Sequence, residues 1–271
     1  MSVLHGGLAL RQHLLAYPEC APDEAVRQLE NGPIAQGRYD YLTALETAML
    51  HGWEVFSLGE NMQASLRGAI AVLAQRAKPF WARMATLGRE KVRKLLDVDQ
   101  EQCLRYAGLL DTPLDESSLK WWDDLAKFFR GQQEERRNEI GRQAERLTIA
   151  YENVQLLNLG IAETARWVAL EDHTLGFDVV SFRKADEQPY QICIEVKGSA
   201  SSPTRFILTR NEWDKAESIG EKYFLYVWNI RNESLRIISQ RELSFHVPSD
   251  KGSGRWATVE FIGDEVESVT Y

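Results

Sequence analysis

The chain has 271 residues, 44% of them hydrophobic, and a net charge of −8. This length suits two ordinary domains or one large one, and the composition is that of a globular protein with a full core. With no apolar run of about eighteen residues and no signal-peptide pattern, we expect neither a membrane span nor export. Three widely spaced cysteines favour a reducing cytoplasm. The acidic balance argues mildly against nucleic-acid binding by the whole surface, although a local basic face is compatible with it.

The first half of the chain has the periodicity of helices. Apolar residues recur at helical spacing in runs such as 40–50 and 61–73, and Pro79 and Pro113 interrupt the pattern. We therefore predict an all-helical N-terminal domain over residues 1–130, and we expect it to bind substrate or partners.

One segment of this helical half is strongly basic. Residues 76–94, called the basic segment below, contain seven lysines and arginines but only one acidic residue. A solvated helix face explains such a run about as well as a nucleic-acid contact does. On the nucleic-acid interpretation, the phosphate-binding residues are Arg83, Arg89, Lys91, Arg93 and Lys94, with Arg210 from later in the chain.

The charged stretch 131–138 is interpreted as an exposed helix or linker at a domain boundary, and an amphipathic helix follows over about 138–157. The residue pattern then changes to short apolar and β-branched runs typical of strands. We predict strands at 165–170, 177–183, 190–197, 205–208, 223–229, 235–239 and 256–262. Residues 131–271 are thus expected to form an α+β or α/β domain with a central mixed sheet flanked by helices.

A helix is also predicted between two of these strands. Thr209 and Glu212 have the spacing of a capping box, and the helical pattern continues to Gly220. Capping accounts for Glu212, and we favour it over a catalytic role. Arg210 opens the same helix and is a candidate for phosphate contact at the positive end of the helix dipole.

Three charges stand in strands that are otherwise apolar. Asp178 lies in the run 176–182, and Glu195 and Lys197 lie in the run 192–198. Desolvating an unpaired charge costs several kcal/mol or more, so a role beyond packing is indicated. Because side chains two apart in a strand share a face, Glu195 and Lys197 point the same way.

Neighbouring carboxylates repel, and one takes up a proton unless a cation lies between them. Mg²⁺, or Mn²⁺ in its place, suits a site made of Asp178, Glu195 and the backbone carbonyl of Val196. A bound cation would acidify a water molecule and stabilise charge on a scissile phosphate. Lys197 would orient that water, help to deprotonate it, or offset charge in the transition state.

Sites of this kind commonly take a further carboxylate from the preceding helix. Glu145 and Glu152 are seven residues apart and therefore share one helix face, so both are candidates. A surface ion pair on an edge strand would also give a bare Asp…Glu-x-Lys pattern. The apolar flanks, the order of the strands and the helix before them favour a catalytic or once-catalytic site.

Residues from about 141 to 229 resemble the protein NO VEIN C-terminal domain family, a branch of the PD-(D/E)XK, or restriction-endonuclease-like, superfamily. The matching pieces are Gly141–Glu145 with Tyr151-Glu152, Gly176–Phe182, Ile194–Lys197, Phe206–Glu212 and Tyr223–Val227. The resemblance implies a restriction-endonuclease-like core and a Mg²⁺-dependent phosphodiesterase. It carries the catalytic carboxylates and lysine onto Asp178, Glu195 and Lys197, and the helix glutamate onto Glu145 first and Glu152 second.

The expected function is therefore a metal-dependent endonuclease in a prokaryotic restriction or anti-phage defence system, with DNA favoured over RNA as substrate. The partner protein could be an ATPase, a helicase or another defence protein. A homodimer is also compatible with the sequence. The alternative is an inactive nuclease-fold module that binds nucleic acid or a defence partner, since fold alone does not prove catalysis.

Overall fold

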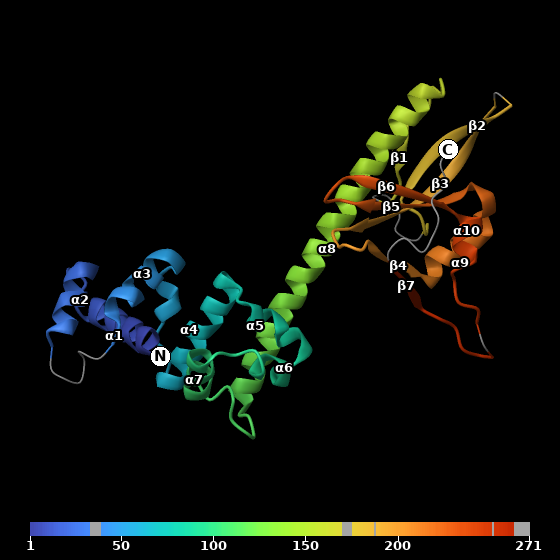
Figure 1. Cartoon of the computed structure of the whole chain (residues 1–271). Coiled ribbons are helices and arrows are strands. Elements are labelled where there is room, and N and C mark those ends of the chain that lie inside the picture. Colours follow the sequence, from blue (N-terminus) through green and yellow to red (C-terminus); the bar gives the residue numbers. More distant parts are fainter. Residues whose placement is uncertain (33–38, 170–174, 187, 251, 263–271) are drawn as a thin grey trace. The chain divides into compact units, whose positions relative to one another are not determined.

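The computed structural model describes residues 1–32, 39–169, 175–186, 188–250 and 252–262. The chain divides into two compact units, Met1–Gln133 and Glu134–Tyr271, which are described separately (Figure 1). The sequence-based boundary between residues 130 and 131 stays a prediction, because one helix runs through both ranges. Within the described ranges, no helix is both long and apolar enough to cross a membrane.

The N-terminal unit is helical, as the periodicity predicts. Its core is built from large apolar side chains, among them Phe56, Leu66, Trp81 and Trp122. Its complete elements are α1 (Ser2–Ala16), α2 (Pro22–Glu30), α3 (Tyr41–His51), η1 (Trp53–Phe56), α4 (Met62–Ala77), α5 (Phe80–Arg83), η2 (Met84–Leu87), α6 (Arg89–Arg93) and α7 (Val98–Tyr106).

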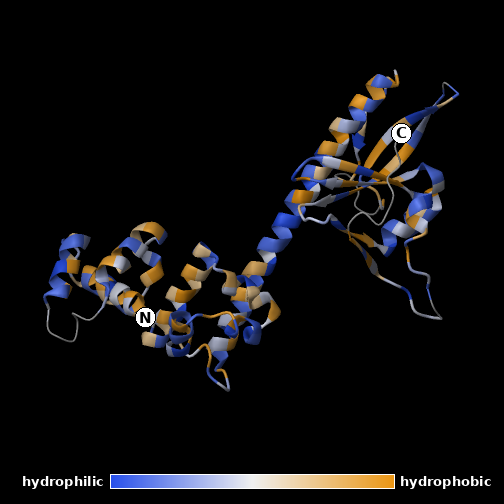
Figure 2. Cartoon of the chain, viewed as in Figure 1, coloured by the Kyte–Doolittle hydropathy of each residue, from blue (hydrophilic) through white to orange (hydrophobic). Residues whose placement is uncertain are grey.

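The next element, α8, is a single helix over Glu116–Asn158. Of the two predicted alternatives for residues 131–138, an exposed helix or a linker, the structure shows the helix. It is continuous with the helix predicted after it, so the two are one element. The stretch contains no proline, and glutamine, glutamate and arginine are good helix formers, so nothing in it ends the helix. Residues 133–139 are exposed, and this middle part of α8 is strongly hydrophilic in Figure 2.

The C-terminal unit contains a five-stranded mixed sheet in the order β1-β2-β3-β5-β6. Neighbouring strands pair antiparallel except β3 and β5, which are parallel. The strands are β1 (Arg166–Trp167), β2 (Val179–Ala185), β3 (Gln188–Ser199), β5 (Tyr223–Asn229) and β6 (Ser234–Ser239). The predicted α+β architecture is therefore confirmed. Leu170, included in the first predicted strand, lies outside the described residues.

Two further strands, β4 (Arg205–Thr209) and β7 (Thr258–Ile262), pair antiparallel in a sheet of their own. The sequence predicts both strands but assigns them to one common sheet. Three short elements complete this unit, namely α9 (Arg210–Ile219), η3 (Gly220–Lys222) and α10 (Gln240–Ser244). The predicted capping box at the start of α9 is present, with both of its hydrogen bonds.

The two faces of the five-stranded sheet are covered differently. Ile192, Ile194 and Val196 of β3 belong to a cluster that includes Ala144 of α8. Cys193 belongs to the other cluster, which contains residues of β4, α9 and α10 (Figure 1). Because Glu195 and Lys197 alternate with Ile194 and Val196, they lie on the Cys193 face, as the strand periodicity predicts.

Close approach of α8 to β3 depends on a glycine. A Cβ atom at Gly198 would lie 2.8 Å from the backbone oxygen of Ile140 and 3.1 Å from the Cβ of Ala144. Any larger residue at position 198 would therefore push α8 away from β3. The glycine thus allows α8 to pack closely against β3 on the face opposite Glu195 and Lys197.

Candidate functional site

Asp178 is held at the point where β2 begins. Its N–H donates to the carbonyl of Ile194 over 2.9 Å, and its own carbonyl accepts from the N–H groups of Val168 and Ala169. The side-chain Oδ2 accepts a hydrogen bond of 2.8 Å from the N–H of Val196. Backbone bonds on both sides thus fix the Asp178 carboxylate beside the strand that carries Glu195.

Glu195 and Lys197 form a close ion pair on β3. The Lys197 Nζ lies 2.7 Å from Glu195 Oε1, and the side chains are only 16% and 7% exposed. The same ammonium lies 2.9 Å from Glu212 Oε2, which belongs to α9. Lys197 is therefore shared between two carboxylates that come from different elements.

The protonation of this group reflects its burial and its excess of acids. Burial raises the pKa of Glu195 well above its ordinary value; Lys197 opposes the rise, and the Asp178 and Glu212 carboxylates add to it. Burial disfavours the Lys197 ammonium, but the two carboxylates beside it outweigh this effect and raise its pKa. Burial is thus the main cause of the raised pKa of Glu195, and the neighbouring carboxylates of Asp178 and Glu212 reinforce it.

Glu145 approaches Asp178 from α8. Burial raises the pKa of Glu145 to about 7, and the Asp178 carboxylate contributes to the rise, while the Trp167 indole and two neighbouring arginines oppose it. The Trp167 indole nitrogen is buried, and among the residues that the structure describes no acceptor lies at hydrogen-bonding distance and angle from it. We take its effect on Glu145 as that of a nearby donor rather than of a formed bond.

Glu152, the second candidate on the same helix face, is held elsewhere. It is fully buried and accepts hydrogen bonds from both Nη atoms of Arg183, at 2.7 and 2.9 Å. The hydroxyl of Tyr226 donates to Glu152 Oε1 over 2.6 Å. These three groups satisfy one another, so the structure brings Glu145 and not Glu152 to Asp178.

Glu212 has a role that local sequence does not show. Its capping bonds with Thr209 are present, yet the carboxylate also pairs with Lys197. We call Glu145, Asp178, Glu195, Lys197 and Glu212 together the acid–lysine cluster. A capping signal explained Glu212 locally, and only the packing of α9 against β3 reveals the second contact.

Tyr223, at the start of β5, also borders the cluster. It lies in a segment that matches the family, but it was not among the predicted site residues. Its side chain is buried, and its hydroxyl donates to the carbonyl of Gly176, two residues before Asp178. Burial raises the pKa of this phenol, and the carboxylates of Glu195, Glu212 and Asp178 add to the effect. Tyr223 therefore remains protonated and ties the segment that carries Asp178 to the sheet.

The predicted phosphate-binding residues are spread over the two units. Arg83 donates to the carbonyl of Lys78 and Arg89 to that of Asp111, and the remaining three, Lys91, Arg93 and Lys94, are exposed. Arg210 pairs with Asp214 and Asp250 at 2.6 and 2.8 Å and stacks over the Trp256 ring. A phosphate would have to compete with these two carboxylates for Arg210.

The donor set of the cluster suits a hard divalent cation with few protein ligands. Within the ranges that the structure describes, no three His, Cys, Asp or Glu side chains are grouped to hold an ion by themselves. Mg²⁺ usually keeps several waters and binds one or two carboxylates. Asp178 and Glu195, with the Val196 carbonyl as an oxygen ligand from the same strand, fit that requirement.

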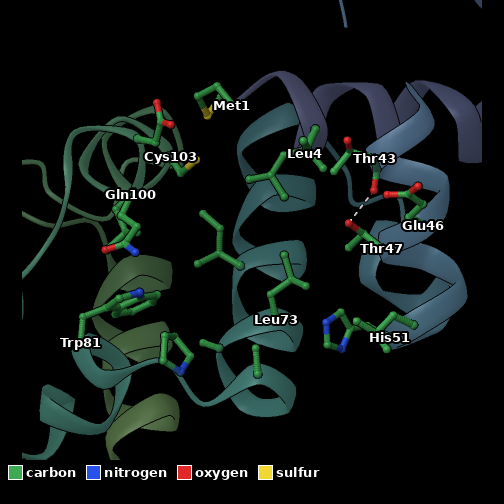
Figure 3. A pocket seen from close by; sticks show the side chains of 18 residues that line it. Met1, Leu4, Thr43, Glu46, Thr47, His51, Leu73, Trp81, Gln100 and Cys103 are labelled. Carbon is green, nitrogen blue, oxygen red and sulfur yellow. Dashed lines mark hydrogen bonds between the residues drawn. The ribbon is translucent and has the colours of Figure 1, made fainter. Parts of the chain in front are cut away.

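A separate cavity lies within the N-terminal unit. Its volume is about 560 Å³, and Figure 3 shows its lining, which includes Leu4, Leu73, Trp81 and Cys103. The walls are mainly apolar, and no member of the acid–lysine cluster lines it. Its size does not make it the candidate active site, because the convergent titratable groups lie in the C-terminal unit.

The mixed sheet and its buried cluster define the C-terminal unit as an α+β module. Residues 144–239, about a third of the chain, match the family model described as Protein NO VEIN, C-terminal. The family resemblance predicted from the sequence is thus confirmed for this part of the chain, which contains every member of the acid–lysine cluster.

A comparison with the curated proteins gave no match. Among solved structures, a nuclease from a fusselovirus is similar, at 15% sequence identity and a TM-score of 0.33. The match covers 48% of this chain and 86% of the viral protein.

Proposed function

We propose that the C-terminal unit is a nuclease that hydrolyses phosphodiester bonds of DNA with the help of Mg²⁺ or Mn²⁺. The observation that carries the proposal is the convergence of Asp178, Glu195 and Lys197 in a largely buried cluster. Packing does not explain several acids around one buried ammonium, because removing charged groups from water costs free energy. Titratable groups with perturbed pKa values are concentrated at functional sites, so a catalytic role accounts for these side chains.

In this proposal, the cation is held by Asp178, Glu195 and the Val196 carbonyl. When bound, it supplies Lewis acidity toward the phosphate and a more acidic water molecule. Lys197 provides a fixed positive charge beside the reacting phosphate, and it orients the attacking water by hydrogen bonding. Its direct contact with Glu195 keeps that charge within the cluster.

Glu145 is proposed to exchange a proton with the reacting groups. A carboxyl group whose pKa is about 7 binds and releases protons readily at neutral pH, which is the property required of a general acid or base. The water loses one proton as its oxygen bonds to phosphorus, and the departing ester oxygen gains one. In this proposal, Glu145 makes one of these two transfers.

DNA is the substrate that we favour, with contacts to phosphates from the basic segment. Exposed Lys91, Arg93 and Lys94 supply positive charge in a chain whose net charge is −8. A role in prokaryotic restriction or anti-phage defence, with an ATPase or helicase partner, rests on the family resemblance. We propose a cytoplasmic location, because the three cysteines form no disulfide and thiols stay reduced in that compartment.

The test is cleavage of DNA by the purified chain. Supercoiled plasmid and labelled single- and double-stranded oligonucleotides are incubated with Mg²⁺, with Mn²⁺, or with a chelator. Asp178→Ala and Lys197→Ala should abolish cleavage, whereas Glu139→Gln, an exposed substitution on α8, should leave it unchanged. The chelator should also abolish it.

Cleavage that survives both Asp178→Ala and Lys197→Ala would refute the assignment of the site. Absence of cleavage by the wild-type chain, together with retained DNA binding, would instead favour the inactive binding module. The ion pairs of Lys197 bear on this choice, because both of its carboxylate partners belong to the cluster and neither draws it away.

A further inference from the structure

Glu212 is tied to two groups through one oxygen atom. Its Oε2 accepts a hydrogen bond of 2.9 Å from the Thr209 N–H, as a capping box requires. The same Oε2 lies 2.9 Å from the Lys197 Nζ. The bond that caps α9 therefore also fixes the atom to which the ammonium is bound.

Helix capping does not by itself require this second contact. The capping box of α10 has the same design, with Glu242 Oε2 accepting from the Ser239 N–H over 2.8 Å. The two boxes differ in what surrounds the carboxylate. Glu212 is only 16% exposed in its side chain, and its carboxylate adds to the negative charge that acts on the buried Glu195.

We propose that Glu212 is a positioning residue that holds the Lys197 ammonium at a fixed point between α9 and β3. The inference builds on the proposed nuclease function, because it assigns Glu212 a part in that reaction. Without Glu212, the ammonium would keep Glu195 as its carboxylate partner. It would then compete with the cation for Glu195 and would lose the anchor that α9 provides.

Glutamine at position 212 separates the two roles of the side chain. Its amide oxygen can still accept from the Thr209 N–H, so the capping box is retained, but the negative charge opposite Lys197 is lost. Glu242→Gln is the matched control, because it makes the same change in the other capping box. Thr209→Ala is the reciprocal control, since it weakens the cap and leaves the Glu212 carboxylate in place.

The first measurement is the ¹⁵N–¹H signal of the Lys197 ammonium, assigned by its disappearance in Lys197→Arg. An ammonium held by two carboxylates exchanges its protons slowly with water. Glu212→Gln should speed this exchange several-fold, and Glu242→Gln should not change it. Glu212→Asp, which keeps the charge but withdraws it by one methylene, should lie between wild type and Glu212→Gln.

The second measurement is steady-state cleavage. Misplacing a catalytic group by about 1 Å can cost on the order of 100-fold in rate, so we expect Glu212→Gln to lower kcat by roughly 10- to 100-fold. KM should change by less than about twofold, because Glu212 acts through Lys197 rather than by binding substrate. Glu242→Gln should leave both constants unchanged.

An unchanged ammonium exchange rate in Glu212→Gln would overturn the proposal, as would equal effects of Glu212→Gln and Thr209→Ala on exchange and kcat. The latter result would reduce Glu212 to a helix cap. Lack of cleavage by the wild-type chain would refute the proposed nuclease function and the kinetic role of Glu212 with it. The exchange measurement would still decide, independently, whether Glu212 holds Lys197.

Discussion

Replacing Glu145 with glutamine should stabilise the C-terminal unit at alkaline pH. Burial, and after it the Asp178 carboxylate, raises the pKa of Glu145 to about 7 from an ordinary value of 4.5. Between these two values the folded protein binds more protons than the unfolded chain. The free energy of unfolding therefore falls as pH rises through this window, and the loss is complete above about pH 7.

The magnitude follows from the displacement of the pKa. At about 1.4 kcal/mol for each pH unit, the full displacement corresponds to roughly 3 kcal/mol. Glu145 is only half-buried, so solvent screens part of this penalty, and we expect about 1–2 kcal/mol at pH 8. Glutamine has nearly the same volume and cannot ionise, so Glu145→Gln should gain this amount at pH 8 and little at pH 5.

Amide hydrogen exchange of β5 provides the assay, because this strand lies in the core of the C-terminal unit and reports on that unit alone. Wild type and Glu145→Gln are compared at the same pH, from 5 to 8, with Glu139→Gln as the exposed control on the same helix. Equal protection of wild type and Glu145→Gln at pH 8, or a pH-independent loss in the variant, would refute the account of Glu145.

Three further predictions concern structural support and substrate binding. Arg183→Met should destabilise the C-terminal unit by about 3 kcal/mol in urea unfolding, because it leaves the Glu152 charge buried without its cation; Glu152→Gln added to it should recover part of the loss. Gly198→Ala should destabilise by about 1–3 kcal/mol, measured in the same way, because its Cβ would meet the Ile140 backbone. Replacing Lys91, Arg93 and Lys94 of the basic segment with glutamine should weaken DNA binding and flatten its salt dependence in fluorescence anisotropy titrations; unchanged binding would assign this segment to a solvated helix face.

Local regularities explain what the sequence could predict. The alternation of side chains in a strand is a property of single residues and their neighbours, so the shared face of Glu195 and Lys197 followed directly from their spacing. The bounds of β5 coincide with the predicted strand 223–229 for the same reason, since every residue in the run is apolar, aromatic or β-branched until Asn229. The capping box of α9 likewise needs only four consecutive residues.

Contacts between distant residues explain what the sequence could not predict. Glu145 and Glu152 share a helix face, and nothing local distinguishes them. Arg183 does so, by pairing with Glu152 from 31 residues away in the sequence. Arg210 illustrates the same limit. Its pairing with Asp214, four residues away on the same helix, is predictable from the spacing, whereas its pairing with Asp250, forty residues away, is not.

Residues 131–138 of α8 show what a charge pattern leaves open. A highly charged stretch is compatible with both a linker and an exposed helix, because both are solvated. No proline occurs in residues 131–138 or in the flanking parts of α8, and the helix continues through them. The two glycines, Gly131 and Gly141, are too weak a signal to end a helix of this length.

The most direct test of the central claim is the binding of a divalent cation to the acid–lysine cluster. Mn²⁺ titrations followed by electron paramagnetic resonance should give one site per chain in the wild type, and Asp178→Asn or Glu195→Gln should eliminate it. Glu152→Gln should retain the site, because Arg183 and Tyr226 hold Glu152 away from Asp178. Wild-type protein that binds no Mn²⁺, or Asp178→Asn protein that binds it as tightly as wild type, would contradict the account.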